Sequence, residues 1–120
     1  MHVTLITGTP AAGEGRVRFD GGDPVFGGHF ADAPVLPGVA LIDAAVTLVS
    51  RAAQRALRLA RVGSVKFRNV VRPGEEIAFT FTTEPAAGTP GALSVRGQWL
   101  RGTEKIADLA FVAVPREACP

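Results

Sequence analysis

A histidine preceded by two glycines is the first residue of this 120-residue chain whose setting suggests chemistry. His29 follows Gly27 and Gly28, and glycines allow a sharp turn and the close approach of another molecule. The imidazole can take up a proton near neutral pH, so His29 is a candidate general base. It could equally be a loop histidine whose ring bonds to the backbone, and His2, near the N-terminus, is assigned no role.

Asp43 is the second candidate, because it is the only charged residue between Asp32 and Arg51. A carboxylate in such an apolar stretch is costly to bury unless it has a partner or stays protonated. A neutral carboxylic acid is suited to donate a proton to a leaving hydroxyl group. The alternative is that Asp43 begins a solvated stripe on a helix, together with polar residues at helical spacing, namely Thr47, Ser50 and Gln54.

The dipeptide Pro37-Gly38 is typical of the start of a helix, where the first backbone amides have no acceptor within the helix. A thioester carbonyl placed beyond this end would have its developing negative charge stabilised. Proline is also common at helix starts that have no catalytic role. By itself, the dipeptide therefore indicates a helix start rather than an oxyanion site.

The helix that follows is predicted over residues 38–61, because the stretch has no proline or internal glycine and is rich in residues that favour helix. Gly63 is expected to mark its end. The first half is apolar on nearly every face and should be enclosed by protein. The second half should emerge into solvent, since it carries a polar stripe made of Arg51, Gln54, Arg55, Arg58 and Arg61.

Two short strands are predicted before this helix, where apolar and polar residues alternate over 3–7 and 16–19. The residues between them, 8–15, are rich in glycine and alanine and are expected to form a turn. Residues 20–37 contain too many glycines and prolines for extended regular structure, so we expect a loop there, of the kind that often carries function.

The period switches to two after the helix, which predicts strands over about 64–69, 77–82 and 93–99. Residues 105–114 are apolar at both parities and should form a central strand covered on both faces. This order predicts an α+β fold in which a curved antiparallel sheet wraps around one long central helix, with residues 1–120 as a single domain. The open sheet edges favour a homodimer with a continuous sheet.

Composition argues against several other classes of protein. The 13 basic and 11 acidic residues are mixed and give a net charge of only +2, and aromatic residues are scarce, so nucleic-acid binding is not expected. The longest apolar stretch, 35–49, falls short of the ~20 residues of a membrane span. A single cysteine, Cys119, cannot close a disulfide within the chain, and no secretory signal is visible, so we expect a cytoplasmic protein.

The loop and helix start, read together, resemble the signature of the 3-hydroxyacyl-acyl-carrier-protein dehydratases of bacterial fatty-acid synthesis. The resemblance lies in Gly28-His29-Phe30, a proline five residues after the histidine, Pro37-Gly38 three residues further on, and an acid fourteen residues after the histidine. It continues more loosely through residues 65–75. Two positions depart from the family pattern: Ala31 stands where many members have proline, and Thr47 where glutamine is usual.

The resemblance implies the hot-dog fold and a dimer with two sites, in each of which the histidine of one subunit faces the acid of the other. It makes His29 the base for the carbon next to the carbonyl and assigns the 3-hydroxyl to Asp43. The amides of Gly38 and Val39 would bind the thioester oxygen. A substrate tunnel along the interface would involve Phe30, Pro37 and Thr47, and no metal ion or cofactor is expected.

The implied partner is an acyl carrier protein, whose acidic surface could dock on basic residues. The candidates for docking are Arg16, Arg18, Lys66, Arg68 and Arg72, although outward basic residues are more often ordinary solvated surface. Two other functions use the same fold. In a thioesterase Asp43 would activate water and His29 would be secondary, and a non-catalytic subunit would bind acyl groups without turnover.

Overall fold

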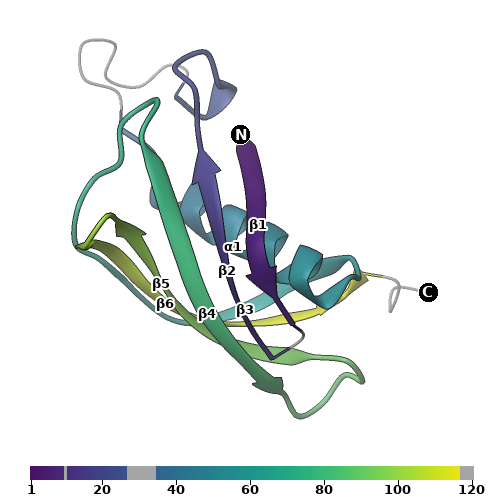
Figure 1. Ribbon diagram of the computed structural model, residues 1–120. Helices are drawn as coiled ribbons and strands as arrows, with labels where there is room; N and C mark the ends of the chain where they lie inside the picture. Colours follow the sequence, from purple (N-terminus) through teal and green to yellow (C-terminus); the bar gives the residue numbers. More distant parts are fainter. Residues whose placement is uncertain (10, 27–34, 117–120) are drawn as a thin grey trace.

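The computed structural model describes residues 1–9, 11–26 and 35–116 of the chain (Figure 1). Along the chain, one long helix follows the first two strands of these residues and precedes the other four. The elements in chain order are β1 (His2–Gly8), β2 (Ala12–Arg18), a short 3-10 helix η1 (Pro24–Phe26), α1 (Gly38–Ala53), β3 (Leu57–Phe67), β4 (Glu76–Pro85), β5 (Leu93–Arg101) and β6 (Glu104–Pro115).

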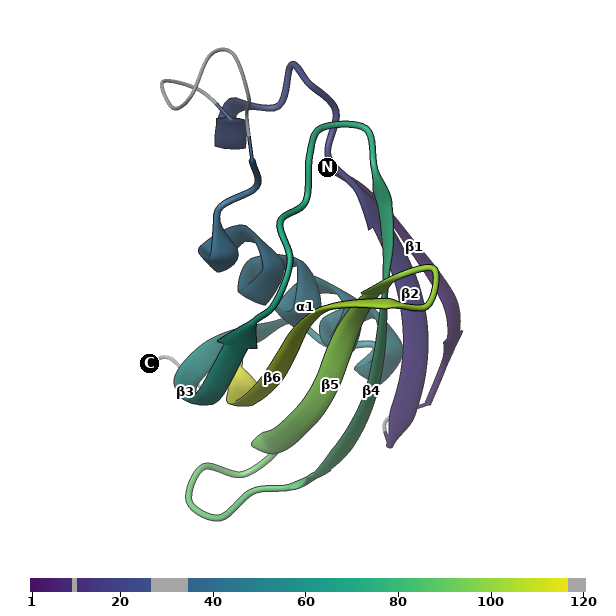
Figure 2. The ribbon, with the colours of Figure 1, turned by 90° about the vertical axis from the view of Figure 1, so that its left-hand side faces the viewer.

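All the strands belong to one antiparallel sheet in the order β1-β2-β4-β5-β6-β3, so β1 and β3 are its edges. The sheet curves around α1, which lies in its concave side (Figure 2). The predicted α+β hot-dog architecture is therefore confirmed. Among the described residues, no helix is long and apolar enough to cross a membrane.

The core lies between the concave face of the sheet and the inner side of α1. Ala44 and Ala45 are completely buried, and their small side chains let the helix lie close to the strands. Trp99 of β5 is also completely buried, and its Nε1 donates a hydrogen bond of 3.1 Å to the backbone carbonyl of Leu41. This bond fixes the axial position of α1 on the sheet.

The predicted extent of the helix, to residue 61, is wrong. The helix ends at Ala53, and Gln54 adopts a left-handed conformation (φ 55°) from which its amide donates to the carbonyl of Arg51. The chain then turns and enters β3 at Leu57. Pairing with β6 along almost the whole length of β3 outweighs the helix propensity of alanine, leucine and arginine.

Two β-bulges explain why the sequence of β3 looks helical. They lie between Leu59 and Arg61 and between Val62 and Ser64, and each inserts a residue, so apolar side chains recur every three residues. Leu59, Val62 and Val65 stand opposite β6 residues that belong to the core, and opposite residues of a strand pair share a face. These three apolar residues, whose spacing in the sequence resembles that of a helix, thus lie on one face of a strand.

The basic residues predicted as the helix's exposed stripe are redistributed accordingly. Arg58 and Arg61 lie on β3, opposite Val114 and Val112 of β6, rather than on a helix. Gly63 lies inside the strand and does not end a helix.

The predicted turn over 8–15 is also too long, because Gly13 and Gly15 belong to β2. A side chain at Gly13 would collide with the ring of Phe81, and one at Gly15 would collide with the buried side chain of Leu48. These glycines therefore serve close packing inside a strand rather than a turn.

Candidate active site

Asp43 lies on the side of α1 that its own sheet leaves uncovered. Its side chain is exposed in the single chain, and Val39, one turn earlier, is 70% exposed. The expectation that the first half of the helix is enclosed is therefore wrong for one chain by itself. The sheet covers only the face that carries Ala40, Leu41 and Ala44.

A cavity of about 300 Å³ adjoins Asp43 between α1 and the beginning of β3. Its walls are mainly aliphatic, and Asp43 is the only carboxylate among the described residues that line it. The described residues that line it are Val39, Ile42, Asp43, Val46, Leu57, Arg58, Leu59 and Arg116. A carboxyl group in such a cavity can reach a polar group on a largely hydrophobic ligand.

The polar residues that follow Asp43 on the helix are bonded to backbone. Thr47 donates from Oγ1 to the carbonyl of Asp43 at 3.0 Å, and the Ser50 hydroxyl oxygen accepts the amide of Leu57 at 3.2 Å. Both residues are half-buried. The polar residues that follow Asp43 therefore stabilise the backbone, whereas the side chain of Asp43 faces solvent beside the cavity.

The start of α1 presents backbone amides toward the same region. Pro37 is extended (φ −63°, ψ 144°), and Ala40 is the first helical residue whose amide has an acceptor in the described chain, the carbonyl of Pro37 at 3.0 Å. The amides of Gly38 and Val39 have no acceptor among the described residues. Phe67 of β3 packs over Gly38, where an added Cβ would lie 2.7 Å from its Cε2 atom.

His29 and Phe30 lie outside the described residues, so their roles stay predictions. The residues that flank this segment, Phe26 and Leu36, are both buried in the core. The amide of Leu36 also donates to the carbonyl of Val71 at 2.7 Å. The described chain is thus packed into the core on both sides of this segment, and Leu36 lies two residues before the helix start.

Comparison with known families decides the class of protein. A family model described as ApeI-like, ApeI dehydratase, matches residues 9–98, which include Asp43, the helix start and the strands β2, β3, β4 and most of β5. The chain belongs to the ApeI-like dehydratase family.

Curated relatives of this ApeI-like chain include two 3-hydroxyacyl-acyl-carrier-protein dehydratases named FabZ. The enzyme of Ligilactobacillus salivarius is 33% identical over 94 residues, which are 72% of this chain and 66% of the enzyme. That of Syntrophobacter fumaroxidans is 30% identical over 108 residues, which are 80% of this chain and 74% of the enzyme. The chain thus spans about two thirds to three quarters of the length of these relatives.

Solved structures confirm the fold. The dehydratase heterocomplex ApeI:P from Xenorhabdus doucetiae contains a chain that superposes with a TM-score of 0.70 at 19% identity, covering 94% of this chain and 98% of that one. Protein PH1136 from Pyrococcus horikoshii superposes with a TM-score of 0.72 at 15% identity, covering 95% and 82%. At these identities the likeness concerns the fold alone.

The basic residues predicted to dock a carrier are not gathered in one place on the ApeI-like chain. Arg16 and Arg18 lie on β2, whereas Lys66 lies on β3, and β4, β5 and β6 separate these two strands. Arg16 and Arg18 also pair with carboxylates of the chain, Glu76 at 3.4 Å and Asp20 at 3.1 Å. Their charge is thus partly neutralised where they stand.

Near β3, Arg68 is likewise paired, with Asp108 at 3.0 Å. The hydrogen bond from Arg68, helped by Lys105, holds the pKa of Asp108 below its usual value. Lys66 and Arg72 have no carboxylate partner among the residues described. These two are the members of the predicted set whose charge stays available to a partner.

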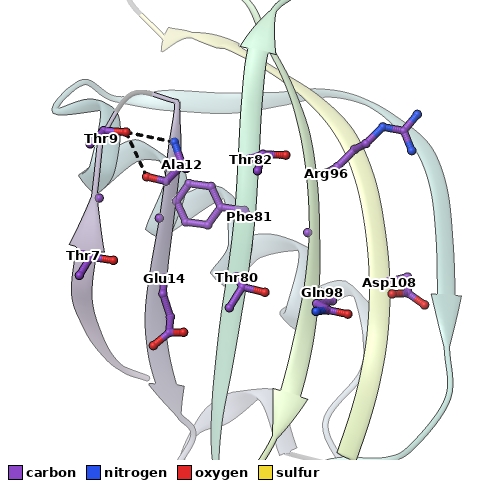
Figure 3. A pocket seen from close by; sticks show the side chains of 13 residues that line it. Thr7, Thr9, Ala12, Glu14, Thr80, Phe81, Thr82, Arg96, Gln98 and Asp108 are labelled. Carbon is purple, nitrogen blue, oxygen red and sulfur yellow. Dashed lines mark hydrogen bonds between the residues drawn. The ribbon is translucent and has the colours of Figure 1, made fainter. Parts of the chain in front are cut away.

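A larger hollow, of about 680 Å³, lies on the opposite face of the sheet from α1 (Figure 3). Thr80 and Thr82 line it and alternate along β4 with the buried Phe79 and Phe81, so it is on the outer, solvent-facing side. Figure 3 shows polar side chains of β2, β4 and β5 side by side there, namely Glu14, Thr80 and Gln98. Neither Asp43 nor the start of α1 lines this hollow, so it is not the site of the predicted chemistry.

Several residues of the Asp43 cavity were not predicted from the sequence. Leu57, Arg58 and Leu59 were assigned to the helix, so their position opposite Asp43 could not be foreseen. Apolar residues recur every three positions from Leu59 to Val65. This spacing resembles that of a helix, but a strand with two bulges produces it too, and it is the signal that could have indicated a strand here.

Proposed function

We propose that the chain dehydrates 3-hydroxyacyl thioesters to trans-2-enoyl thioesters, with His29 and Asp43 as its acid/base pair. The observation that carries the proposal is the carboxyl group of Asp43, which adjoins a mainly aliphatic cavity at the start of α1, where two amides have no acceptor among the described residues. Membership of a dehydratase family supports the reaction type. The activity, substrate and partners of the whole protein are all part of the proposal.

In this mechanism His29 takes the proton from carbon 2 of the substrate, and the electron pair of that C–H bond forms the double bond to carbon 3. The C3–O bond breaks, and Asp43 gives its proton to the departing hydroxyl, which leaves as water. The amides of Gly38 and Val39 bind the thioester oxygen while negative charge develops on it. Acid/base steps contribute about 10²- to 10⁴-fold each and an oxyanion donor about 3 kcal/mol, which is adequate for elimination.

The proposal includes a homodimer in which β3 of each copy pairs with β3 of the other. Strand β3 is an edge strand of 11 residues, most of them exposed, and long open edges are usually covered. Large apolar side chains are exposed on β3 and at the nearby start of α1. They are Val39 (70%), Leu59 (38%), Val62 (42%) and Phe67 (49%).

A second copy seated on this surface would enclose Asp43 and its cavity. It would also allow the His29 loop of one copy to reach Asp43 of the other. Dimerisation and catalysis are therefore linked in the proposal, because each site is complete only between two copies.

The acyl chain would occupy the cavity and continue along the dimer interface past Phe30, Pro37 and Thr47. We propose that an acyl carrier protein delivers it, with Lys66 and Arg72 as the cations free to meet an acidic surface. Dimer-based higher oligomers are compatible with the same interface.

The test is hydration of a short trans-2-enoyl thioester, the reverse reaction, followed by the loss of its conjugated absorbance. His29→Ala and Asp43→Asn should each lower the rate by at least about 10²-fold and leave the size of the oligomer unchanged in light scattering. Glu14→Gln, which alters a carboxylate on the outer face of the sheet, should keep the normal rate. Near-normal hydration by either site variant would remove the assigned roles.

The same preparations separate the thioesterase from the dehydratase. Matched 3-hydroxyacyl and saturated acyl thioesters are incubated with the protein, and free thiol and enoyl product are both measured. Thiol release from both substrates without enoyl product would support hydrolysis, and binding without conversion would support a non-catalytic subunit.

A further inference from the structure

The connection between β3 and β4, residues 68–75, links the start of α1 to the rest of the sheet. The carbonyl of its Val71 accepts the amide of Leu36 at 2.7 Å, two residues before Gly38. At its other end, the amide of Gly74 donates to the carbonyl of Phe19 at 2.8 Å, just beyond β2. Any movement of this connection would therefore move the chain that leads into the helix.

A single side chain, Arg101 at the end of β5, spans this connection. Its Nη1 donates to the carbonyl of Val70 at 2.9 Å and to Oε1 of Glu75 at 2.9 Å. The same Glu75 oxygen accepts the backbone amide of Arg72 at 2.6 Å. The guanidinium thus joins both ends of the turn that contains Val71, and it does so from a different strand.

The guanidinium is held in turn by Glu104, whose Oε1 accepts Nε at 3.0 Å and Nη2 at 2.5 Å. The Arg101 side chain is only 25% exposed, so its orientation is restricted. The hydrogen bonds and charges of Glu104 and Glu75 keep the pKa of Arg101 above its ordinary value. A planar guanidinium can serve three acceptors at once, which an ammonium group on a flexible stem cannot do in the same geometry.

We propose that Arg101 is a positioning residue, which fixes residues 68–75 and through the Val71 carbonyl holds Leu36 and the start of α1 in the arrangement needed to bind the thioester oxygen. The effect of Arg101 on catalysis rests on the proposed function, whereas its effect on the position of Leu36 does not. Arg101 touches neither Asp43 nor the cavity beside it, so its effect must pass through the connection and Leu36.

The mechanical part is tested by amide hydrogen exchange. In Arg101→Met the amide of Leu36 should exchange at least about 10-fold faster than in the wild-type protein, because the contacts of its acceptor loop with Arg101, at Val70 and Glu75, are lost. In Glu104→Gln the loop contacts to Val70 and Glu75 remain, so exchange at Leu36 should change much less. Arg96→Met, an exposed arginine on the same strand, is the matched control and should leave exchange at Leu36 unchanged.

The catalytic part is tested by the steady-state kinetics of the same variants. Displacement of a reacting group by a remote mutation can cost about 10²-fold, so Arg101→Met should lower kcat for enoyl hydration by about 10- to 100-fold while KM changes by less than about 3-fold. Arg101→Lys, which keeps the charge and one donor direction, should recover part of kcat. Glu75→Gln provides a second route to the same loss if Arg101→Met fails to fold, since it weakens the other side of the contact.

The outcomes separate this inference from the proposed function. Unchanged Leu36 exchange in both Arg101→Met and Glu75→Gln would overturn the positioning role, whatever the activity. Faster exchange at Leu36 with unchanged kcat would overturn its catalytic consequence. A wild-type protein without hydratase activity would overturn the proposed function, and exchange at Leu36 would still decide the mechanical role of Arg101.

Discussion

Substitution of Gly38 by alanine tests the helix start directly, because the structure leaves no room for a side chain there. A Cβ at this position would lie 2.7 Å from Cε2 and 3.0 Å from Cε1 of Phe67, inside ordinary van der Waals contact at 3.4 Å or more. Overpacking of this kind costs about 1–3 kcal/mol. Phe67 is 49% exposed and can partly retreat, so we expect the lower end of that range.

Alanine also favours helix over glycine by up to about 1 kcal/mol, so the single variant would show only the difference between two opposing effects. A double-mutant cycle with Phe67→Ala separates them. Gly38→Ala should be neutral or stabilising in the Phe67→Ala background and less favourable by about 1–2 kcal/mol in the wild-type background, measured as the coupling in urea unfolding. Additive effects of the two substitutions would refute the packing of Phe67 over the helix start.

Three further predictions concern the core, the dimer and the response to pH. Trp99→Phe should lose about 2 kcal/mol of unfolding free energy, measured by chemical denaturation, because the hydrogen bond to Leu41 is removed and a cavity forms; unchanged stability would contradict this. Val62→Lys places a charge on the exposed apolar face of β3 and should convert the proposed dimer to monomer in light scattering, whereas a variant that stays dimeric would count against β3 pairing. Because the Arg68 hydrogen bond depresses the pKa of Asp108, the stabilisation it gives is complete above the ordinary value of 3.8 and is lost as pH falls below it. Thermal unfolding across acidic pH should therefore show a smaller acid-induced loss in Asp108→Asn than in the wild type, and equal losses would refute the stabilising role of this pair.

The architecture could be predicted from the sequence because the alternation of apolar and polar residues persists through most strands. The end of α1 could not. Residues after Ala53 lack a proline or glycine stop, and Gln54 takes the left-handed conformation that glycine usually supplies. The helix ends there because the following residues pair with β6, a contact between segments far apart in the chain.

The candidate site was predictable only in part. A charge in an apolar stretch pointed to Asp43, but its exposure in one chain depends on which face of the helix the sheet covers. The walls supplied by Leu57 and Leu59 depend on the pairing of β3 with β6, whose two bulges give the strand a three-residue apolar spacing that also fits a helix. The role of Arg101 has no local sequence signal, since its contacts with Val70 and Glu75 lie 31 and 26 residues away along the chain.

The account depends most on His29 of one copy acting with Asp43 of the other. This is tested by forming a heterodimer of a His29→Ala chain and an Asp43→Asn chain with two affinity tags, and measuring enoyl thioester hydration. One of its two sites would have both residues intact, so we predict about half of the wild-type rate per dimer, while each homodimeric variant stays nearly inactive. A heterodimer as inactive as the two parent variants would contradict a site shared between subunits.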